Sequence, residues 1–228
     1  MNQIHKLRYA SVNIIIVALI VTLYFALNSE GTLPAMNTNI IYMGESDKKI
    51  AFQCTVSYNA AALSNILDLV NARGIKMTFI VSGEWAVDNK DMLNKIASDG
   101  HEIATMGMRY YLDGPIEDDI RDSISIIENI TGKRPAFYFI GEKNVANTAS
   151  ACEKERIWGI LCTVDLLSSR GGKYEIIARA KRRLVPGSII SVSPTAHLFD
   201  ALPDILDLYA NAGLSVVPTG EVANISNG

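Results

Sequence analysis

The chain has 228 residues, a net charge of −3 and an apolar content of 49%. This length suffices for one well-cored domain with an appendage. The charge shows no basic excess, which argues against nucleic-acid binding, so no nucleic-acid partner is expected.

The segment 9–28 is apolar and contains no charged residue. A helix of about 20 such residues is long enough to cross the hydrocarbon core of a bilayer. Lys6 and Arg8 precede the segment, whereas the first charge after it is Glu30. The positive-inside rule therefore predicts a cytoplasmic N-terminus at 1–8, a single transmembrane helix, and a cell-membrane protein whose C-terminal domain is extracytoplasmic.

A cleaved signal peptide is the alternative for this segment, because it shares the basic start. The long apolar stretch and the absence of an A-x-A-like site favour an uncleaved anchor. Residues 29–47 are polar and show no sustained period, so they are interpreted as a linker. The domain is expected at 48–222, followed by a short tail at 223–228.

Short apolar runs alternate with amphipathic stretches throughout this domain. Strands are predicted at 50–54, 77–81, 102–105, 137–140, 159–163, 188–192 and 216–217. Helices are predicted at 61–71, 91–98, 116–130, 149–156, 174–184 and 201–211. Such alternation predicts an α/β fold with a parallel sheet and right-handed crossovers. Periodicity alone does not distinguish an open sheet from a closed barrel, and the number of strand–helix units favours the barrel.

The three cysteines are Cys54, Cys152 and Cys162. An odd number excludes a fully paired disulfide framework. A bridge between Cys152 and Cys162 stays open at this point, and buried, unpaired thiols are the expectation for all three.

Several segments together resemble one family. They are the run 76–85 (KMTFIVSGEW), the element 100–103 (GHEI) and the block 186–190 (PGSII) with the residues after it. Their order and spacing are similar to those of the polysaccharide deacetylases, the NodB-homology group or carbohydrate esterase family 4, and to their spore-associated, membrane-anchored branch. The resemblance implies a distorted (β/α) barrel over 48–222 that removes N-acetyl groups from glycans with a divalent metal such as zinc.

The positions that carry the family's chemistry hold other residues here. Thr55 stands at the position of the catalytic base and Val56 at that of a metal-binding Asp, while Met106 and Tyr110 replace two metal-binding histidines. Threonine cannot act as a base unaided, and valine has no lone pair to offer a cation. A thioether and a neutral phenol are poor substitutes for two imidazoles. No metal site and no cofactor are therefore expected.

Three further positions follow the same trend. The resemblance places Tyr138 at the position of an arginine and Ser193 at that of the general-acid histidine, while Asp165 keeps its motif's first carboxylate. Tyr110 and Tyr138 are expected to line the former groove, where aromatic rings suit a sugar face. The resemblance places His101 in the strand framework rather than the metal set, and His197 is interpreted as an exposed loop residue.

The expected function is that of a membrane-anchored, extracytoplasmic polysaccharide deacetylase-like protein that is catalytically inactive. It would bind cell-wall glycan or act as a scaffold in cell-wall or spore-envelope carbohydrate metabolism. One alternative is an active hydrolase of N-acetyl carbon–nitrogen bonds with a site rebuilt from Asp165, Ser193 and His197. Another is a protein-interaction module with no glycan affinity; its protein partners cannot be named from the sequence.

Overall fold

The computed structural model describes residues 39–56, 62–112, 114–182 and 184–225. These residues belong to one compact unit, 39–228. The membrane helix predicted at 9–28 lies outside the described residues. Among the described residues, no helix is long and apolar enough to span a bilayer.

The unit is built on a parallel sheet of nine strands in the order β1-β6-β5-β4-β3-β2-β8-β7, with β9 also paired to β2. The strands are β1 (Ile40–Ile41), β2 (Lys49–Thr55), β3 (Thr78–Val81), β4 (Glu102–Thr105), β5 (Phe137–Phe139), β6 (Trp158–Ile160), β7 (Val164–Asp165), β8 (Ile189–Val192) and β9 (Ser215–Val217). The helices are α2 (Leu63–Ala72), α3 (Gly83–Asp88), α4 (Lys90–Ser98), α5 (Ile116–Thr131), α6 (Val145–Lys154), α7 (Lys173–Lys181), α8 (Ala196–Asn211) and α9 (Thr219–Val222).

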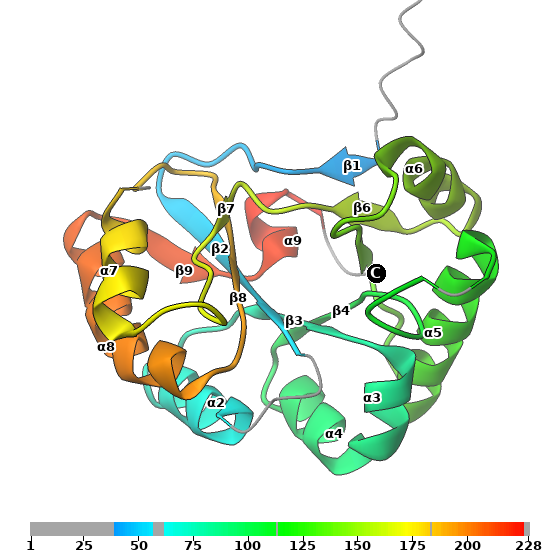
Figure 1. Ribbon diagram of the computed structural model, residues 1–228, viewed down its shortest axis with the longest axis horizontal. Coiled ribbons are helices and arrows are strands. Elements are labelled where there is room, and N and C mark those ends of the chain that lie inside the picture. The colour runs from blue at the N-terminus through cyan, green and yellow to red at the C-terminus, as the bar shows by residue number, and fades with distance from the viewer. Residues whose placement is uncertain (1–38, 57–61, 113, 183, 226–228) are drawn as a thin grey trace, which may run out of the picture. The chain divides into compact units, whose positions relative to one another are not determined.

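The sheet curls into part of a barrel, with the longer helices around its outside (Figure 1). Its two end strands, β1 and β7, are not paired with each other in the part of the chain that the structure describes. The gap between them is crossed by loop contacts, in which Thr163 Oγ1 donates to the Tyr42 carbonyl and Met43 forms an isolated bridge with Ser188. The predicted parallel α/β fold is therefore confirmed, but the strands form an open, curled sheet rather than a closed ring.

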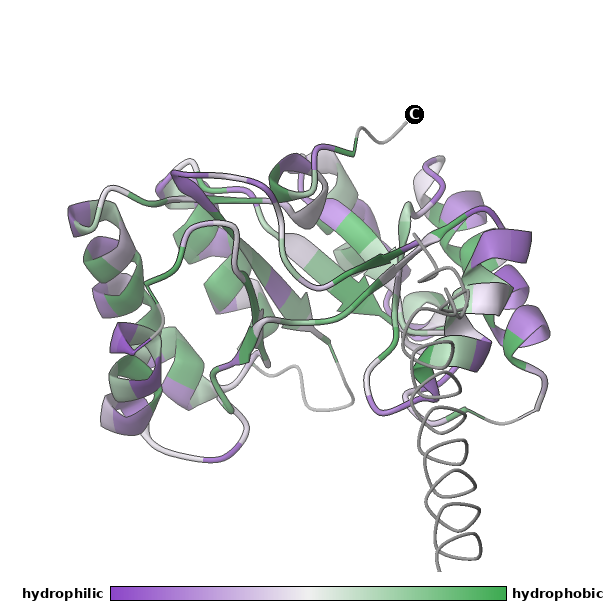
Figure 2. Ribbon diagram, turned by 90° about the horizontal axis from the view of Figure 1, so that it is seen from above, coloured by the Kyte–Doolittle hydropathy of each residue, from purple (hydrophilic) through white to green (hydrophobic). Residues whose placement is uncertain are grey.

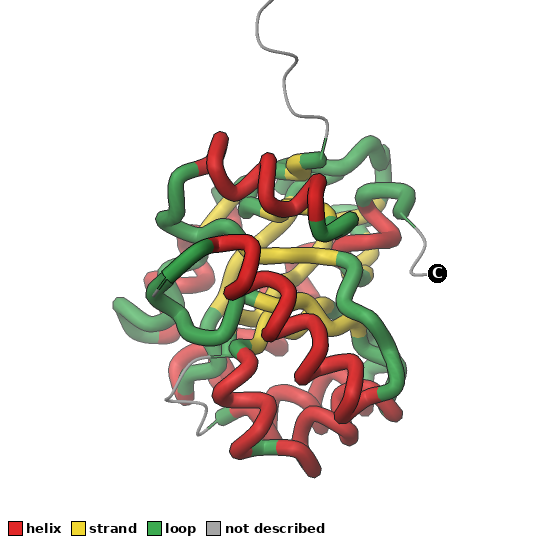
Figure 3. Tube along the Cα trace, turned by 90° about the vertical axis from the view of Figure 1, so that its right-hand side faces the viewer, coloured by secondary structure: helices red, strands yellow, loops and turns green. Residues whose placement is uncertain are grey.

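The helices turn their apolar sides toward the sheet and their polar sides outward (Figure 2). Seen from the side, they cover the strands as an outer layer (Figure 3). Helix α2 is an example, because its buried residues recur at the spacing expected for one helical face. They are Leu63, Ile66, Leu67 and Val70. The sequence predicted this face correctly.

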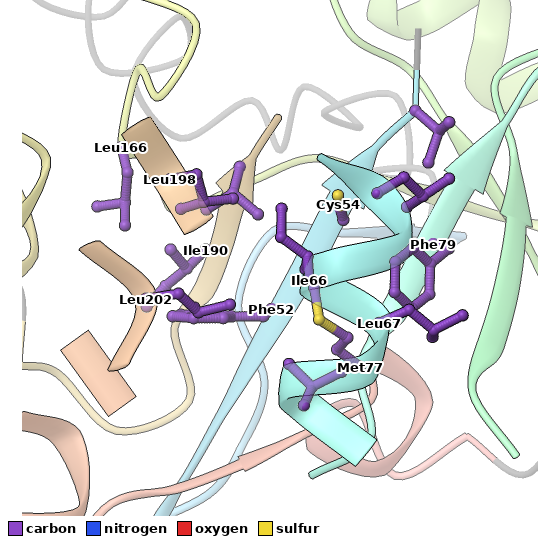
Figure 4. Packing of buried hydrophobic residues seen from close by; sticks show 14 of the residues in the cluster. Phe52, Cys54, Ile66, Leu67, Met77, Phe79, Leu166, Ile190, Leu198 and Leu202 are labelled. Carbon is purple, nitrogen blue, oxygen red and sulfur yellow. The ribbon is translucent and has the colours of Figure 1, made fainter. Parts of the chain in front are cut away.

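The main apolar core lies between β2 and the helices beside it (Figure 4). Phe52 and Cys54 of β2 are fully buried, and the Phe52 ring meets Tyr209 of α8 edge-on at 5.7 Å. Phe79 of β3 and Ile190 of β8 extend the same layer on either side. Burial of a large apolar side chain contributes about 1.5–3 kcal/mol, so this layer holds the strands that carry the candidate site.

The N-terminal ends of the strands are closed by α9 and a buried hydrogen-bond network. Thr78 Oγ1 donates to Glu102 Oε2 at 2.6 Å and accepts from the Thr219 amide at 2.8 Å. The Gly220 amide donates to both Glu102 oxygens at 3.2 Å. These contacts join β3, β4 and α9 at one end of the sheet.

His101 lies beside this network as a structural residue, as predicted. Its Nδ1 accepts from the Met77 amide at 3.3 Å, and its Nε2 lies 3.0 Å from Asn71 Oδ1. Because an amide oxygen only accepts, the proton is on Nε2 and the ring is neutral. Burial, and after it the charge of Lys76, lowers the pKa of His101 to about 4.

The structure corrects the predicted linker at its C-terminal end. Residues 39–47 belong to the domain, because β1 pairs with β6 and the Gly44 amide donates to the Gly187 carbonyl. A two-residue strand is too short to produce a period. Helix α8 begins five residues before the predicted start, at Ala196, because the Thr195 side chain caps it and Pro203 lies inside the helix rather than at its first turn.

Candidate functional site

The candidate site lies where the parallel strands end. The C-terminal ends of parallel strands meet at one edge of a sheet, which is where α/β proteins place their ligands. Thr55 and Val56 lie at the end of β2, and Met106 directly follows β4. Asp165 ends β7, and Ser193 directly follows β8. The fold therefore brings the predicted positions to the same edge.

The position expected to hold a metal-binding carboxylate is apolar and buried. The Val56 side chain is 1% exposed and belongs to the main core, and its amide donates to the Ile80 carbonyl at 2.8 Å. Thr55 is nearly buried, and its hydroxyl has no partner among the described residues. Neither side chain offers an ionised oxygen to a cation or to a proton.

The two positions that would hold imidazoles are no better suited to a metal. Met106 is buried and offers a thioether. Tyr110 is partly exposed, and burial followed by the charge of Glu142 raises its pKa, so the phenol stays protonated and neutral. Within the described ranges, no three His, Cys, Asp or Glu side chains gather closely enough to hold an ion. The donor set therefore does not fit the divalent metal that the fold family implies.

Tyr138 lies in the interior, and the expectation that it lines an open groove is wrong. Its side chain is fully buried, and its hydroxyl donates to Asp119 Oδ2 at 2.9 Å. Burial, reinforced by the charge of Asp119, raises its pKa far above the usual range. A ring with no exposed face cannot stack on a sugar, so Tyr138 belongs to the buried framework of the site and does not contact a ligand.

Asp119, near the start of α5, organises this buried region. Its Oδ1 accepts from the Met108 amide at 2.7 Å, while Oδ2 accepts from Tyr138. Gly107 has φ +98°, and because it has no side chain its backbone can approach the Asp119 carboxylate. A Cβ at this position would lie 1.9 Å from Asp119 Oδ2. Burial raises the pKa of the carboxyl, and these two hydrogen bonds oppose that shift.

Lys143 places a cation above this pair. Its ammonium lies 5.2 Å from the centre of the Tyr138 ring and donates to the Met106 carbonyl at 3.2 Å. Burial lowers the pKa of Lys143, and the negative charge of Asp119 acts against that shift. The positive charge therefore lies next to Met106, a position at which the resemblance implies an imidazole.

A pocket of about 520 Å³ opens over these groups, a size typical of small-molecule sites. Its walls come from the loop after β4, the loop after β5 and the first turns of α5 and α6. They are Met106, Tyr110, Tyr111, Leu112, Gly114, Ile116, Phe139, Gly141, Glu142, Lys143, Asn144, Asn147 and Thr148. The Tyr110 and Tyr111 rings meet edge-on with centroids 4.9 Å apart, and Tyr111 is 76% exposed. Tyr110 thus lines an accessible pocket.

The alternative hydrolytic site is not assembled. Asp165 Oδ1 accepts from the Leu167 amide at 2.7 Å, an interaction within its own turn. Ser193 is held through its backbone, because its amide donates to Ser168 Oγ at 2.6 Å. His197 is exposed in the first turn of α8. Among the described residues, no hydrogen bond joins Asp165, Ser193 and His197.

The cysteines are free thiols in this structure. Cys54 and Cys152 are buried, as expected for small apolar residues, and Cys162 is partly exposed. Burial raises the pKa of Cys152 to about 12, which keeps the thiol protonated. A protonated thiol is a weak nucleophile and a poor metal ligand, so these residues add no chemistry to the site.

Sequence reasoning missed the groups that shape the pocket, namely Asp119, Lys143 and Phe139. Asp119 appears as one of three acidic residues in the first turn of α5, where acidic residues are favoured by the helix dipole. Its neighbour in the chain, Asp118, pairs with Arg121 at 2.9 Å and is exposed. The helical period of the isoleucines was the available signal, because Asp119 lies three residues after Ile116 and therefore on the same side of α5, where it is buried.

Comparison with known proteins agrees with this geometry. Residues 47–152 match the family described as polysaccharide deacetylase. This part of the chain is therefore similar to the polysaccharide deacetylases, and the domain shares its curled parallel half-barrel with solved structures of that class. The uncharacterized protein YlxY of Bacillus subtilis (strain 168) is 24% identical over 193 residues, which cover 81% of this chain. The chain spans 60% of that relative's length.

Solved structures share the fold at low sequence identity. A carbohydrate esterase family 4 pseudoenzyme, BA3943 of Bacillus anthracis, superposes with a TM-score of 0.76 and 20% identity, over 81% of this chain and 68% of its own. A mutant of that pseudoenzyme, described as having restored enzymatic activity, superposes with a TM-score of 0.76 and 19% identity, over 81% of this chain and 71% of its own. Bacillus subtilis PdaA, a family 4 carbohydrate esterase, superposes with a TM-score of 0.74 and 16% identity, over 81% of this chain and 84% of its own.

Proposed function

We propose that the protein is a membrane-anchored, extracytoplasmic polysaccharide deacetylase-like protein that has lost metal-dependent hydrolysis and binds glycan in the pocket above Lys143. The observation that carries this proposal is the side-chain set at the strand ends. Val56 and Met106 are buried, and they and the neutral Tyr110 phenol leave a cation without suitable ligands. The domain keeps the shape of its class while its donor atoms are changed.

Two findings support the loss of activity. Activity depends on the residues of a site rather than on the fold, and the residues here supply neither a base nor a metal. A similarly folded neighbour is described as a pseudoenzyme, so this fold persists without catalysis in at least one protein. The accessible Tyr110 and Tyr111 rings support glycan binding, because aromatic faces pack well against the apolar faces of sugar rings. The spore-associated role stays a prediction from the sequence.

The direct test is acetate release by the full-length protein from N-acetylated wall glycan and chito-oligosaccharides, with zinc, cobalt or nickel added. We expect no release and no stoichiometric metal in the purified protein. An active deacetylase assayed alongside controls for the substrate and the buffer. Chelator-sensitive release, or one metal per chain, would overturn the proposal.

A substitution separates the remaining alternatives. If the protein releases acetate without a metal, the rebuilt-site hypothesis predicts that His197→Ala abolishes that turnover. Unchanged turnover in His197→Ala would contradict a rebuilt site that depends on His197. Binding is then measured with the catalytically silent protein by calorimetric titration of chito-oligosaccharides. Binding that survives Tyr110→Ala unchanged would contradict the pocket as the glycan site, and no binding at all would favour a protein-interaction module.

A further inference from the structure

The Lys143 ammonium has hydrogen-bonding capacity that its contacts within the described part of the protein do not use. Its ammonium has three N–H donors, and the structure shows one of them engaged, by the Met106 carbonyl. Among the described residues, Lys143 forms no ion pair. The negative charge that opposes the lowering of its pKa is that of Asp119, whose two oxygens already accept hydrogen bonds from Met108 and Tyr138.

The surroundings of this cation are mostly apolar. Phe139, Tyr110 and Ile116 line the same pocket, and the amide side chains of Asn144 and Asn147 complete its polar side. Burial already lowers the pKa of Lys143, so a ligand that covers the pocket will desolvate the charge further. Covering a charge without pairing it is costly, and the cost falls when the ligand brings the opposite charge.

We propose that the pocket recognises a carboxylate carried by a sugar ring: the carboxylate pairs with the Lys143 ammonium while the ring packs against Tyr110 and Phe139. This inference rests on the proposed glycan-binding function and names the substrate class of that same pocket, an acidic glycan. A neutral glycan would bury the ammonium unpaired and would bind more weakly.

The charge pattern at the rim favours a single carboxylate rather than a polyanion. Glu142 lines the pocket beside Lys143 and is exposed, so its carboxylate repels a ligand with several adjacent negative charges. The aromatic walls favour a ring over an extended acidic peptide, because they offer flat apolar area rather than backbone hydrogen-bond partners.

The test compares two tetrasaccharides of equal length by calorimetric titration of the full-length protein. One is a hyaluronan tetrasaccharide, which carries carboxylates, and the other is chitotetraose, which is neutral. We expect hyaluronan to bind about tenfold more tightly, which corresponds to about 1.4 kcal/mol. Lys143→Met should bring the two affinities together, whereas Lys143→Arg should keep most of the difference. Lys90→Met, on the exposed start of α4, is the matched control and should change neither affinity.

Each other outcome overturns a defined part of the inference. Equal affinities for the two tetrasaccharides would leave glycan binding intact and remove the carboxylate preference. Binding of acetate or of triglutamate as tightly as hyaluronan would show a general anion site or a peptide site instead of a sugar site. Loss of both affinities in Lys90→Met would show that the effect is not specific to the pocket. If neither tetrasaccharide binds, the proposed glycan function fails together with this inference.

Discussion

The N-terminal and C-terminal ends of the central strands carry polar side chains with different partners. At the N-terminal end, Thr78 bonds to Glu102 and to Thr219, and the amides of Thr219 and Gly220 donate to Thr78 and Glu102. At the C-terminal end, Lys143 and Tyr110 face a pocket. The polar groups of one end are therefore bonded within the protein, whereas those of the other end line a pocket, and ligand sites in parallel α/β folds usually lie at this second end.

The strongest test of this comparison is Glu102→Ala. The substitution removes a buried carboxylate, leaves the Gly220 amide without its acceptor and leaves the Thr78 hydroxyl with Thr219 alone, so we expect a loss of about 3–5 kcal/mol in the free energy of unfolding. Urea denaturation of the full-length protein measures it. Glu221→Ala is the control, because its exposed pair with Lys49 should contribute less than about 1 kcal/mol. Equal losses for the two variants would remove the distinction between the ends.

The second test uses pH at the N-terminal end. The pKa of His101 is lowered in the folded state to about 4, whereas the unfolded chain titrates near its ordinary value, about 6.5. The unfolded state therefore binds the proton more readily, so the stability that His101 contributes is present above about pH 6.5 and is lost as the pH falls toward 4. The full effect is about 3 kcal/mol.

Unfolding curves at several pH values, compared with those of His101→Gln, isolate this contribution. The difference in stability between the two proteins should shrink steadily from pH 7 to pH 4. A constant difference would mean that the histidine titrates normally in the folded protein.

The third test concerns the support beneath the pocket. Asp119→Asn keeps the shape but offers one acceptor oxygen where two are used, so we expect a loss of about 1–2 kcal/mol. It also removes the negative charge that raises the pKa of Lys143, so that pKa should fall further. NMR titration of the Lys143 side chain measures the shift. An unchanged lysine pKa would separate Asp119 from the pocket's electrostatics.

The smallest effect on stability is expected at the pocket wall. Tyr110→Ala removes a partly exposed ring and should cost less than about 1 kcal/mol. Glycan affinity should nevertheless fall several-fold, because the ring supplies contact area. Tyr174→Ala, at an 83% exposed position on α7, is the matched control and should affect neither property. A large loss of stability in Tyr110→Ala would show that the ring is part of the framework.

The sequence predicted the framework better than the site. The helical face of α2 and the apolar runs of β2 and β3 were found because burial imposes a period on the chain. Elements of two residues, such as β1 and β7, carry no period and were missed.

The site was harder to predict for a different reason. The strand ends at Val56 and Met106 follow from the order of the elements alone. The burial of Tyr138 does not, because it depends on a hydroxyl–carboxylate pair between residues 19 positions apart in the chain. The position of the Lys143 ammonium likewise depends on contacts with Met106, directly after β4, and with Tyr138 of β5, and no local sequence pattern predicts them.

The attachment of the domain to the preceding chain has a mechanical consequence. Residue 39 leads directly into β1, an edge strand that pairs over only two residues, Ile40 and Ile41, with β6. After β1, the Tyr42 carbonyl accepts from Thr163 Oγ1, Met43 bridges to Ser188, and the Gly44 amide donates to the Gly187 carbonyl, just before β2 enters the core. A pull along the chain from its N-terminal side would therefore load β1 and these few contacts first, before the force reaches β2 and the pocket.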